Sequence, residues 1–152
     1  MTLDFDKYAG TGNKVVRLLA DDLQTSREKA GRILTAVLHS LRHRLTVQES
    51  FQLMAQLPMA LKAVYVDGWK YKEPFRRIHH VDEFLDEIRM EDGKTADYDF
   101  GNNEEAKKTV TAVFRTLNLF VSEGEVKDII AVLPAELKEF VRGALGEKRM
   151  VL

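Results

Sequence analysis

Two stretches of the sequence, QLPMALKA at residues 56–63 and VLPAELKE at residues 132–139, share the pattern Leu-Pro-x-x-Leu-Lys at an offset of 76 positions. The match is longer than the motif, because residues 30–65 align with residues 106–141 without a gap and are identical at 11 of 36 positions. Chance would give roughly two or three identities at ordinary composition. Self-similarity at a fixed offset indicates a duplicated supersecondary unit.

The pattern of apolar residues in the shared unit is helical. These residues recur at steps of three and four, which places them on one face of a helix. The first stripe comprises Ala30, Leu34, Val37, Leu38, Leu41 and Leu45, and the second comprises Ala106, Val110, Val113, Phe114, Leu117 and Val121. Thr46 with Glu49, and Ser122 with Glu125, fit capping boxes that would each open a further helix.

The Leu-Pro-x-x-Leu-Lys motif is interpreted as architectural. Proline lacks the backbone N–H and clashes with the preceding turn, yet it suits the first turn of a helix. Pro58 and Pro134 are therefore predicted to end one helix and to begin the next. In that next helix the leucines are expected in the core and the lysines in water: Leu61 and Leu137, and Lys62 and Lys138.

The segments outside the shared unit are predicted to be helical, with one exception. An apolar stripe over residues 3–22 comprises Phe5, Tyr8, Val15, Val16 and Leu19. Thr25 with Glu28 fits a capping box that would open the long helix near residue 26. A short helix is expected at about residues 80–90. Residues 91–103 carry turn formers and acids, and are expected to form a surface loop.

Together these patterns predict an all-α fold. The expected architecture is a compact bundle of about eight helices in a single domain, residues 1–152. It would be built from two pseudo-symmetric repeats, the first over about residues 1–78 and the second over about residues 79–152. The hydrophobic share of 45% is enough for a core, so disorder is not expected.

Composition also bounds the setting of the protein. There is no cysteine, which excludes disulfides and thiolate metal sites and suits a reducing cytosol. Neither a signal-peptide pattern nor an uncharged apolar run of membrane-spanning length is present, so a soluble cytoplasmic protein without membrane contact is expected. A pI near 6.4 makes a nucleic-acid partner unexpected, since dedicated binders are usually strongly basic.

Charge is distributed unevenly along the chain. Residues 1–80 hold 13 Lys and Arg against 8 Asp and Glu, a net charge of +5, whereas residues 81–152 hold 10 against 16, a net charge of −6. The two halves are expected to attract each other, either within one chain or across a dimer. Because salt screens exposed charges over about 8–10 Å, this attraction should steer docking more than it stabilises the fold.

Residues 65–80 are the candidate binding segment. They hold the single Trp among aromatic and basic residues, and such a mixture can stack on bases or anionic rings and hold phosphates. The possible ligand or partner surface comprises Trp69, Lys70, Tyr71, Lys72, Arg76, Arg77, His79 and His80. The alternative is that Trp69 is structural, because it aligns with the apolar Leu145 of the second repeat.

Metal binding and catalysis find little support. His39 and His43 have the i, i+4 spacing of a chelating pair, but Arg42 and Arg44 are unfavourable neighbours for a cation. The histidines are therefore interpreted as flanking the core stripe. The sequence has no nucleophile elbow, phosphate-binding loop, dinucleotide fingerprint or zinc-protease motif. No catalytic residue, cofactor or metal is predicted, and the protein is not expected to be an enzyme.

Several stretches together resemble an uncharacterised bacterial family, domain of unknown function 2267 (DUF2267). They are AGRILTAVLHSLRHRLTVQES, QLPMALKAVYVDGW and LPAELKEF, and the resemblance runs from about Phe5 to Val141. It implies a compact helical protein and no agreed activity. The favoured hypothesis is a non-enzymatic helical module that binds a protein partner or itself. The alternative is a small-ligand or nucleic-acid binder that uses residues 65–80.

Overall fold

The computed structural model describes residues 2–72, 80–133 and 135–146 of the chain. This part is built from helices and has no β-strand, so the predicted all-α class is confirmed. None of the helices within these ranges is both long and apolar enough to cross a membrane. In chain order the elements are α1 (Phe5–Leu23), α2 (Arg27–Arg42), α3 (Val47–Ala55), α4 (Met59–Val66), α5 (Val81–Asp92), the 3₁₀ turn η1 (Gly93–Thr95), α6 (Ala96–Phe100), α7 (Asn103–Asn118), α8 (Glu123–Val132) and α9 (Ala135–Gly146).

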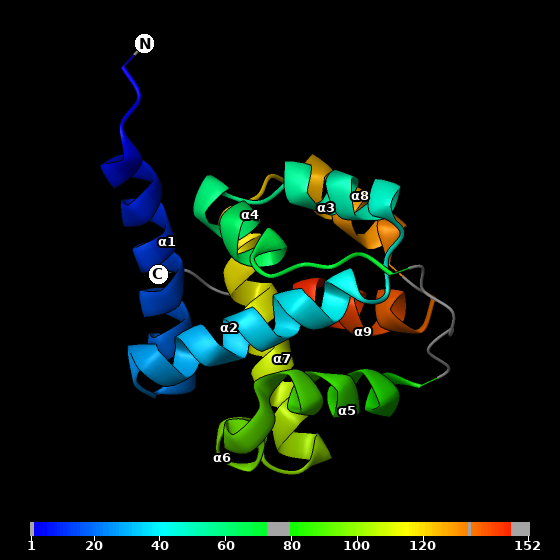
Figure 1. Ribbon diagram of the computed structural model, residues 1–152. Coiled ribbons are helices and arrows are strands. Elements are labelled where there is room, and N and C mark those ends of the chain that lie inside the picture. Colours follow the sequence, from blue (N-terminus) through cyan, green and yellow to red (C-terminus); the bar gives the residue numbers. More distant parts are fainter. Residues whose placement is uncertain (1, 73–79, 134, 147–152) are drawn as a thin grey trace.

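Helices α2 and α7 cross at the centre of the bundle, and the others pack around them (Figure 1). Helices α1 and α5 each contact both central helices. Helix α4 lies on α2 and α1, and α9 lies on α7. Helices α3 and α8 pair with each other at the top of the view.

The helix bounds agree with the offset of 76 positions. Helix α2 begins at Arg27 and α7 at Asn103, and both are 16 residues long. The first helix of each half bridges the two halves, because α1 contacts α7 as well as α2, and α5 contacts α2 as well as α7. Their buried apolar residues form one hydrophobic cluster. This arrangement is compatible with a duplication, and close superposition of the two halves stays a prediction.

Both predicted apolar stripes face the core. All six residues of the first stripe are buried, and so are the first five of the second, while Val121 is half-buried. The stripe of α1 behaves differently. Val15 and Leu19 are fully buried, but Phe5 remains 71% exposed, because α1 extends beyond the helices it packs on (Figure 1).

Side-chain caps fix the starts of the helices. The predicted capping box of α3 is present: the Glu49 N–H donates to Thr46 Oγ1 at 3.1 Å, and the Thr46 N–H donates to Glu49 Oε1 at 2.9 Å. The box predicted at Thr25 is wrong by one residue, because Ser26 Oγ accepts from the Lys29 N–H at 3.1 Å and caps α2. The Glu125 side chain lies outside the described part.

The proline break is confirmed for the first repeat. Helix α3 ends at Ala55, and Pro58 is the N-cap residue of α4. The leucines of the motif are buried and the lysines are half-buried rather than fully exposed: Leu61 and Leu137, and Lys62 and Lys138. Pro134 lies outside the described residues. Gly68 has a φ of +67°, so it provides the left-handed conformation expected of a glycine that follows a helix.

The loop predicted for residues 91–103 is wrong. The end of α5, η1 and α6 occupy this stretch, and Phe100 is buried at 2% exposure. Gly93 and Gly101, with φ of +69° and +65°, supply the turns that were read as loop signals. Tertiary contacts override the weak local propensity here: Phe100 joins the core, and Asp99 binds Arg32 of α2.

Candidate functional site

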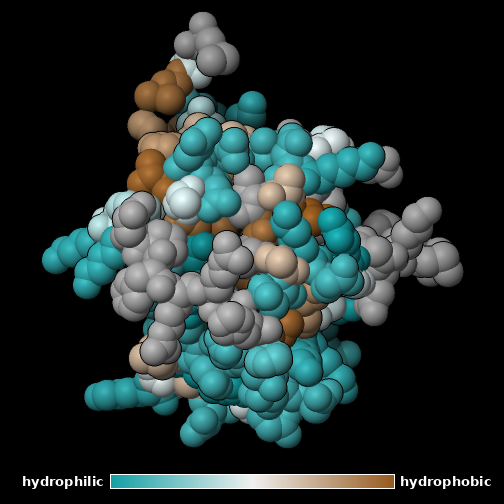
Figure 2. Space-filling model, turned by 90° about the vertical axis from the view of Figure 1, so that its right-hand side faces the viewer, coloured by the Kyte–Doolittle hydropathy of each residue, from teal (hydrophilic) through white to brown (hydrophobic). Residues whose placement is uncertain are grey.

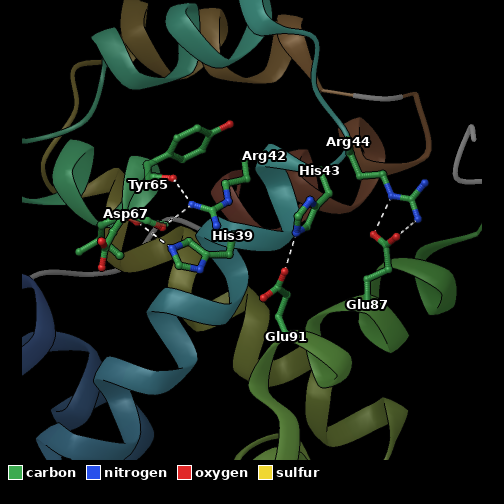
Figure 3. A network of polar contacts seen from close by, with 9 residues as sticks. His39, Arg42, His43, Arg44, Tyr65, Asp67, Glu87 and Glu91 are labelled. Carbon is green, nitrogen blue, oxygen red and sulfur yellow. Dashed lines mark hydrogen bonds and ion pairs between the residues drawn. The ribbon is translucent and has the colours of Figure 1, made fainter. Parts of the chain in front are cut away.

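Arg42 is a buried charge that caps helix α4. It is 7% exposed, and its Nη1 donates to the carbonyl oxygens of Tyr65 at 2.7 Å and Asp67 at 2.8 Å (Figure 3). The last carbonyls of a helix lack intrahelical partners and carry partial negative charge. Burial lowers the pKa of Arg42 below its ordinary value. Arg42 therefore ties the end of α2 to the end of α4 and is structural, a role that the sequence did not predict.

The two histidines of α2 point to different partners. His39 Nε2 lies 2.7 Å from the Val64 carbonyl oxygen, whereas His43 Nε2 lies 2.5 Å from Glu91 Oε1 on α5 (Figure 3). A carbonyl can only accept, so His39 carries a proton on Nε2 and Nδ1 is an acceptor when the ring is neutral. Among the described residues, no group of three His, Asp or Glu is placed to hold a metal ion. The interpretation of the histidines as flanking residues fits this geometry.

Ion pairs join the basic first half of the chain to the acidic second half. Arg44 Nε donates to Glu87 Oε2 at 2.6 Å, and Arg44 Nη2 also contacts the Glu87 carboxylate (Figure 3). His43 and Glu91 form a second contact between α2 and α5. The attraction expected from the charge asymmetry therefore acts within the chain, along the contact between these two helices.

A cluster of two carboxyl groups and one guanidinium links α2 to α6. Arg32 donates to Asp99 through Nε and Nη2, both at 2.9 Å, and the Asp99 side chain is completely buried. Burial alone would raise the pKa of Asp99, but hydrogen bonds from Arg32 and Asp92 lower it. Burial, followed by the hydrogen bond to Asp99, raises the pKa of Asp92 to about 6. Thr95 Oγ1 donates to Asp92 Oδ2 at 3.1 Å.

The Asp92 carboxyl should make folding stability depend on pH. Its pKa in the folded protein, about 6, lies above its ordinary value of 3.8, so the native state binds a proton that the unfolded state releases. Stability from this group is therefore fully present below about pH 4 and is lost as the pH rises to about 6. We expect Asp92→Asn to match the wild type near pH 4 and to exceed it by about 1 kcal/mol at pH 7, a figure reduced for solvent screening.

Urea unfolding of both proteins between pH 4 and pH 8 measures this effect. The asparagine can keep both contacts, since its amide can donate to Asp99 and its oxygen can accept from Thr95. Asp97→Asn is the matched control, because Asp97 is an exposed acid in the same segment. A stability difference for Asp92→Asn that does not change with pH would contradict the assignment of the shared proton to this pair.

An open groove of about 470 Å³ lies beside the cluster, between α2 and the end of α5. Its lining comprises Gly31, Arg32, Thr35, Ala36, His39, Glu91 and Asp92. Figure 3 shows two of these residues, His39 and Glu91, reaching from the two helices. A second, small apolar cavity of about 20 Å³ lies between α2, α3, α7 and α8 and has room for about one water molecule. Within the part of the chain that the structure describes, the groove is a concave polar feature that could accept a ligand.

The described residues of the candidate binding segment, residues 65–80, differ in their exposure. Trp69 is half-buried and packs on the core, edge-to-face between Tyr65 and Tyr71 at ring-centroid distances of 5.6 and 6.1 Å. The remaining described members, Lys70, Tyr71, Lys72 and His80, are exposed. Arg76, Arg77 and His79 lie outside the described residues. The described contacts thus favour a structural role for Trp69, and they bring no basic cluster together around it.

A group of exposed apolar residues lies on α1, just before its start, and on α4, two helices that contact each other. We call this the α1–α4 surface, and its residues are Leu3, Phe5, Ala9, Met59, Ala63 and Val66, all exposed. Met59, Ala63 and Val66 recur at i, i+4 and i+7, so they share one face of α4. Figure 2 shows the face at the right of Figure 1, where hydrophobic colour lies at the upper left and in small patches near the centre, and hydrophilic colour covers the lower part.

Sequence reasoning missed the groove and the α1–α4 surface. The groove combines residues about 60 positions apart, Arg32 and His39 with Glu91 and Asp92, and no local motif joins them. For α4 a signal was available in the i, i+4, i+7 spacing of Met59, Ala63 and Val66. This signal is obscured because the buried residues Leu61 and Tyr65 make most of the helix apolar.

A family model described as "Uncharacterized conserved protein (DUF2267)" matches residues 13–140 of the chain. The match covers most of the chain, from the middle of α1 to α9. It also includes every residue that lines the groove. No protein in the curated collections matches the sequence.

Proposed function

Because the chain belongs to DUF2267, a family with no described activity, we propose its function from its surface: it is a non-enzymatic helical module that associates with a second copy of itself through the α1–α4 surface. The observation that carries the proposal is the exposure of Phe5, at 71%, on the same stripe whose continuation, Val15 and Leu19, is fully buried. Where an apolar stripe of a helix extends beyond the core of its own chain, its exposed part can pack against another helix.

The shape of the surface suits a helical partner. Phe5 of α1 and Met59 of α4 are 71% and 48% exposed, so large apolar side chains are available on both helices. A Cβ added at Gly12 would lie 2.7 Å from Ala60 Cβ, which shows how closely α1 and α4 approach. Two closely packed helices therefore both carry exposed apolar side chains. Surfaces of this kind receive an amphipathic helix through its apolar face.

The charges on α1 favour a second copy as the partner. Asp4 and Asp6 lie at the start of the helix, and Lys7 and Lys14 follow along it. In an antiparallel pair related by a two-fold axis, the acidic end of one helix faces the basic residues of the other. Two-fold dimers are the commonest oligomers, and the same patch serves both partners. Opposite charges at such a rim guide the register of the pair more than they add affinity.

The remaining parts of the proposal concern chemistry and setting. The protein works without catalysis and without a resident cofactor, in the cytoplasm, and nucleic acid is not its partner. A pI near 6.4 and the use of the basic residues Arg32, Arg42 and Arg44 in internal contacts support the last point. The binding function considered for residues 65–80 is not favoured, because Trp69 packs on the core.

Self-association should depend on the α1–α4 surface. We expect sedimentation equilibrium to show a monomer–dimer equilibrium for the wild type at concentrations up to about 1 mM. The double variant Phe5→Ser/Met59→Ser should raise the dimer dissociation constant at least about tenfold, because it removes the largest apolar anchors. Met90→Ser is the matched control, since Met90 is 82% exposed on α5, outside the surface. A monomeric wild type, or equal effects of the two changes, would overturn the proposal.

A further inference from the structure

The groove between α2 and α5 is lined by hydrogen-bond acceptors. Thr35 donates its hydroxyl proton to the Gly31 carbonyl at 2.8 Å, which leaves the lone pairs of Oγ1. His39 donates its Nε2 proton to the Val64 carbonyl, which leaves Nδ1 as an acceptor in the neutral ring. Glu91 and Asp92 add carboxylate oxygens. His39, Glu91 and Asp92 therefore present mainly hydrogen-bond acceptors to a ligand. Thr35 does the same, because its hydroxyl proton is already donated within the protein.

Arg32, the cationic residue in the lining of the groove, already pairs with other groups of the protein. Arg32 makes two hydrogen bonds to the buried Asp99 and an ion pair with Glu28 at 3.5 Å. Its charge is therefore matched by Asp99, and the Asp92 carboxylate has no full counter-ion of its own. Glu91 pairs with His43, which carries a charge only when it is protonated. Near neutral pH the groove thus holds more negative than positive charge.

We propose that this groove binds a primary ammonium group of a small organic amine. An ammonium group has three donors and one positive charge, which suits a lining of acceptors with excess negative charge. The groove volume of about 470 Å³ lies within the range of small-molecule sites, roughly 300–1,000 Å³. A divalent metal is a poorer occupant, because the described residues offer no group of three ligands.

The protonation of Asp92 is coupled to this binding. Arg32 from α2, Thr95 from η1 and Asp99 from α6 surround its carboxyl group, whose pKa is raised to about 6. A bound ammonium group favours the ionised carboxylate and lowers that pKa. Binding should therefore strengthen as the pH rises from about 5 to about 7, while the ammonium group itself stays protonated.

Gly31 offers a way to block the groove without changing its charge. A Cβ built at Gly31 meets no atom within 4 Å, so a larger side chain would extend into open space at the lining. Gly31→Leu should keep the helix, since leucine is a better helix former than glycine. Asp92→Asn removes the charge and keeps the hydrogen bonds to Asp99 and Thr95. The two variants test space and charge separately.

A titration with 1,4-diaminobutane, followed through the backbone amide signals in two-dimensional NMR, tests the proposal. We expect saturable shifts centred on Gly31, Thr35 and His39, with a dissociation constant in the millimolar range for so small a ligand. Asp92→Asn and Gly31→Leu should each weaken binding about five-fold or more. Glu104→Gln, a change of an exposed acid on α7, is the control and should bind as the wild type does.

Three probes separate the proposal from less specific binding. 1,4-Butanediol has the same length without charge, and tetramethylammonium has the charge without donors, so neither should give saturable shifts. Nα-acetyl-lysine amide distinguishes a protein lysine from a free amine, and the proposal requires 1,4-diaminobutane to bind more tightly. No saturation with the diamine, equal binding of tetramethylammonium, or unchanged affinity in both groove variants would overturn the assignment.

Discussion

Arg42→Met is expected to lower the free energy of unfolding by about 2–4 kcal/mol. Methionine has a similar length and remains apolar, so the change removes the donors without opening a large cavity. The carbonyl oxygens of Tyr65 and Asp67 then lose a partner that is nearly buried. Each hydrogen bond to a charged group contributes about 1.5–3 kcal/mol, and part of that is offset because the guanidinium itself no longer has to be buried.

Urea unfolding at neutral pH measures this loss, and circular dichroism reports whether helix content is kept. Arg17→Met is the matched control, because Arg17 is an exposed arginine on α1 and should change stability by less than about 0.5 kcal/mol. The stability loss for Arg42→Lys should fall between those of the other two variants, since an ammonium group can reproduce only part of the hydrogen-bond geometry of a guanidinium. A loss below about 1 kcal/mol for Arg42→Met would mean that solvent satisfies the end of α4.

Trp69→Ala is expected to lower stability by at least about 2 kcal/mol. Full burial of a tryptophan would place the loss at about 3–5 kcal/mol, and half-burial moves the value toward the lower end. The indole packs against the core and lies between the rings of Tyr65 and Tyr71, so its removal takes away both area and edge-to-face contacts. Gly68, with its positive φ, sets the turn that directs the side chain inward.

The neighbouring lysines provide the control for Trp69. Lys70 and Lys72 are exposed, and replacement of either by alanine should change stability by less than about 0.5 kcal/mol. Urea unfolding of the three variants under one set of conditions gives the comparison. A neutral Trp69→Ala would show that the indole is free on the surface, and residues 65–80 would then return as a binding segment.

Periodicity predicted the helices of this fold well where apolar stripes are long. The stripe from Ala30 to Leu45 lies on the core in full, and the motif at Pro58 separates α3 from α4 as expected. The capping position of α2 could not be fixed because Thr25 and Ser26 both carry hydroxyl groups, and only the geometry of the turn selects Ser26. Such one-residue differences need backbone coordinates.

Short elements held by tertiary contacts could not be read from the sequence. Residues 96–100 form α6 because Phe100 enters the core and Asp99 meets Arg32, a residue 67 positions earlier. The groove has the same origin, since its lining comes from two helices that only the packing of α2 on α5 brings together. The predicted stripe of α1 does lie along one helix, and Val15 and Leu19 are buried. Phe5 at its start is exposed, because burial along α1 depends on the lengths of the neighbouring helices.

Cross-linking through a single introduced cysteine tests the role of the α1–α4 surface most directly, because the natural sequence contains no cysteine. Ala9 is exposed near the middle of the first half of α1, so in an antiparallel pair Ala9→Cys places two thiols close to the two-fold axis. Met90→Cys, on α5, is the control. With a short bis-maleimide, the account predicts efficient formation of a covalent dimer for Ala9→Cys and little for Met90→Cys. Equal yields for the two variants, or monomer alone for Ala9→Cys, would contradict it.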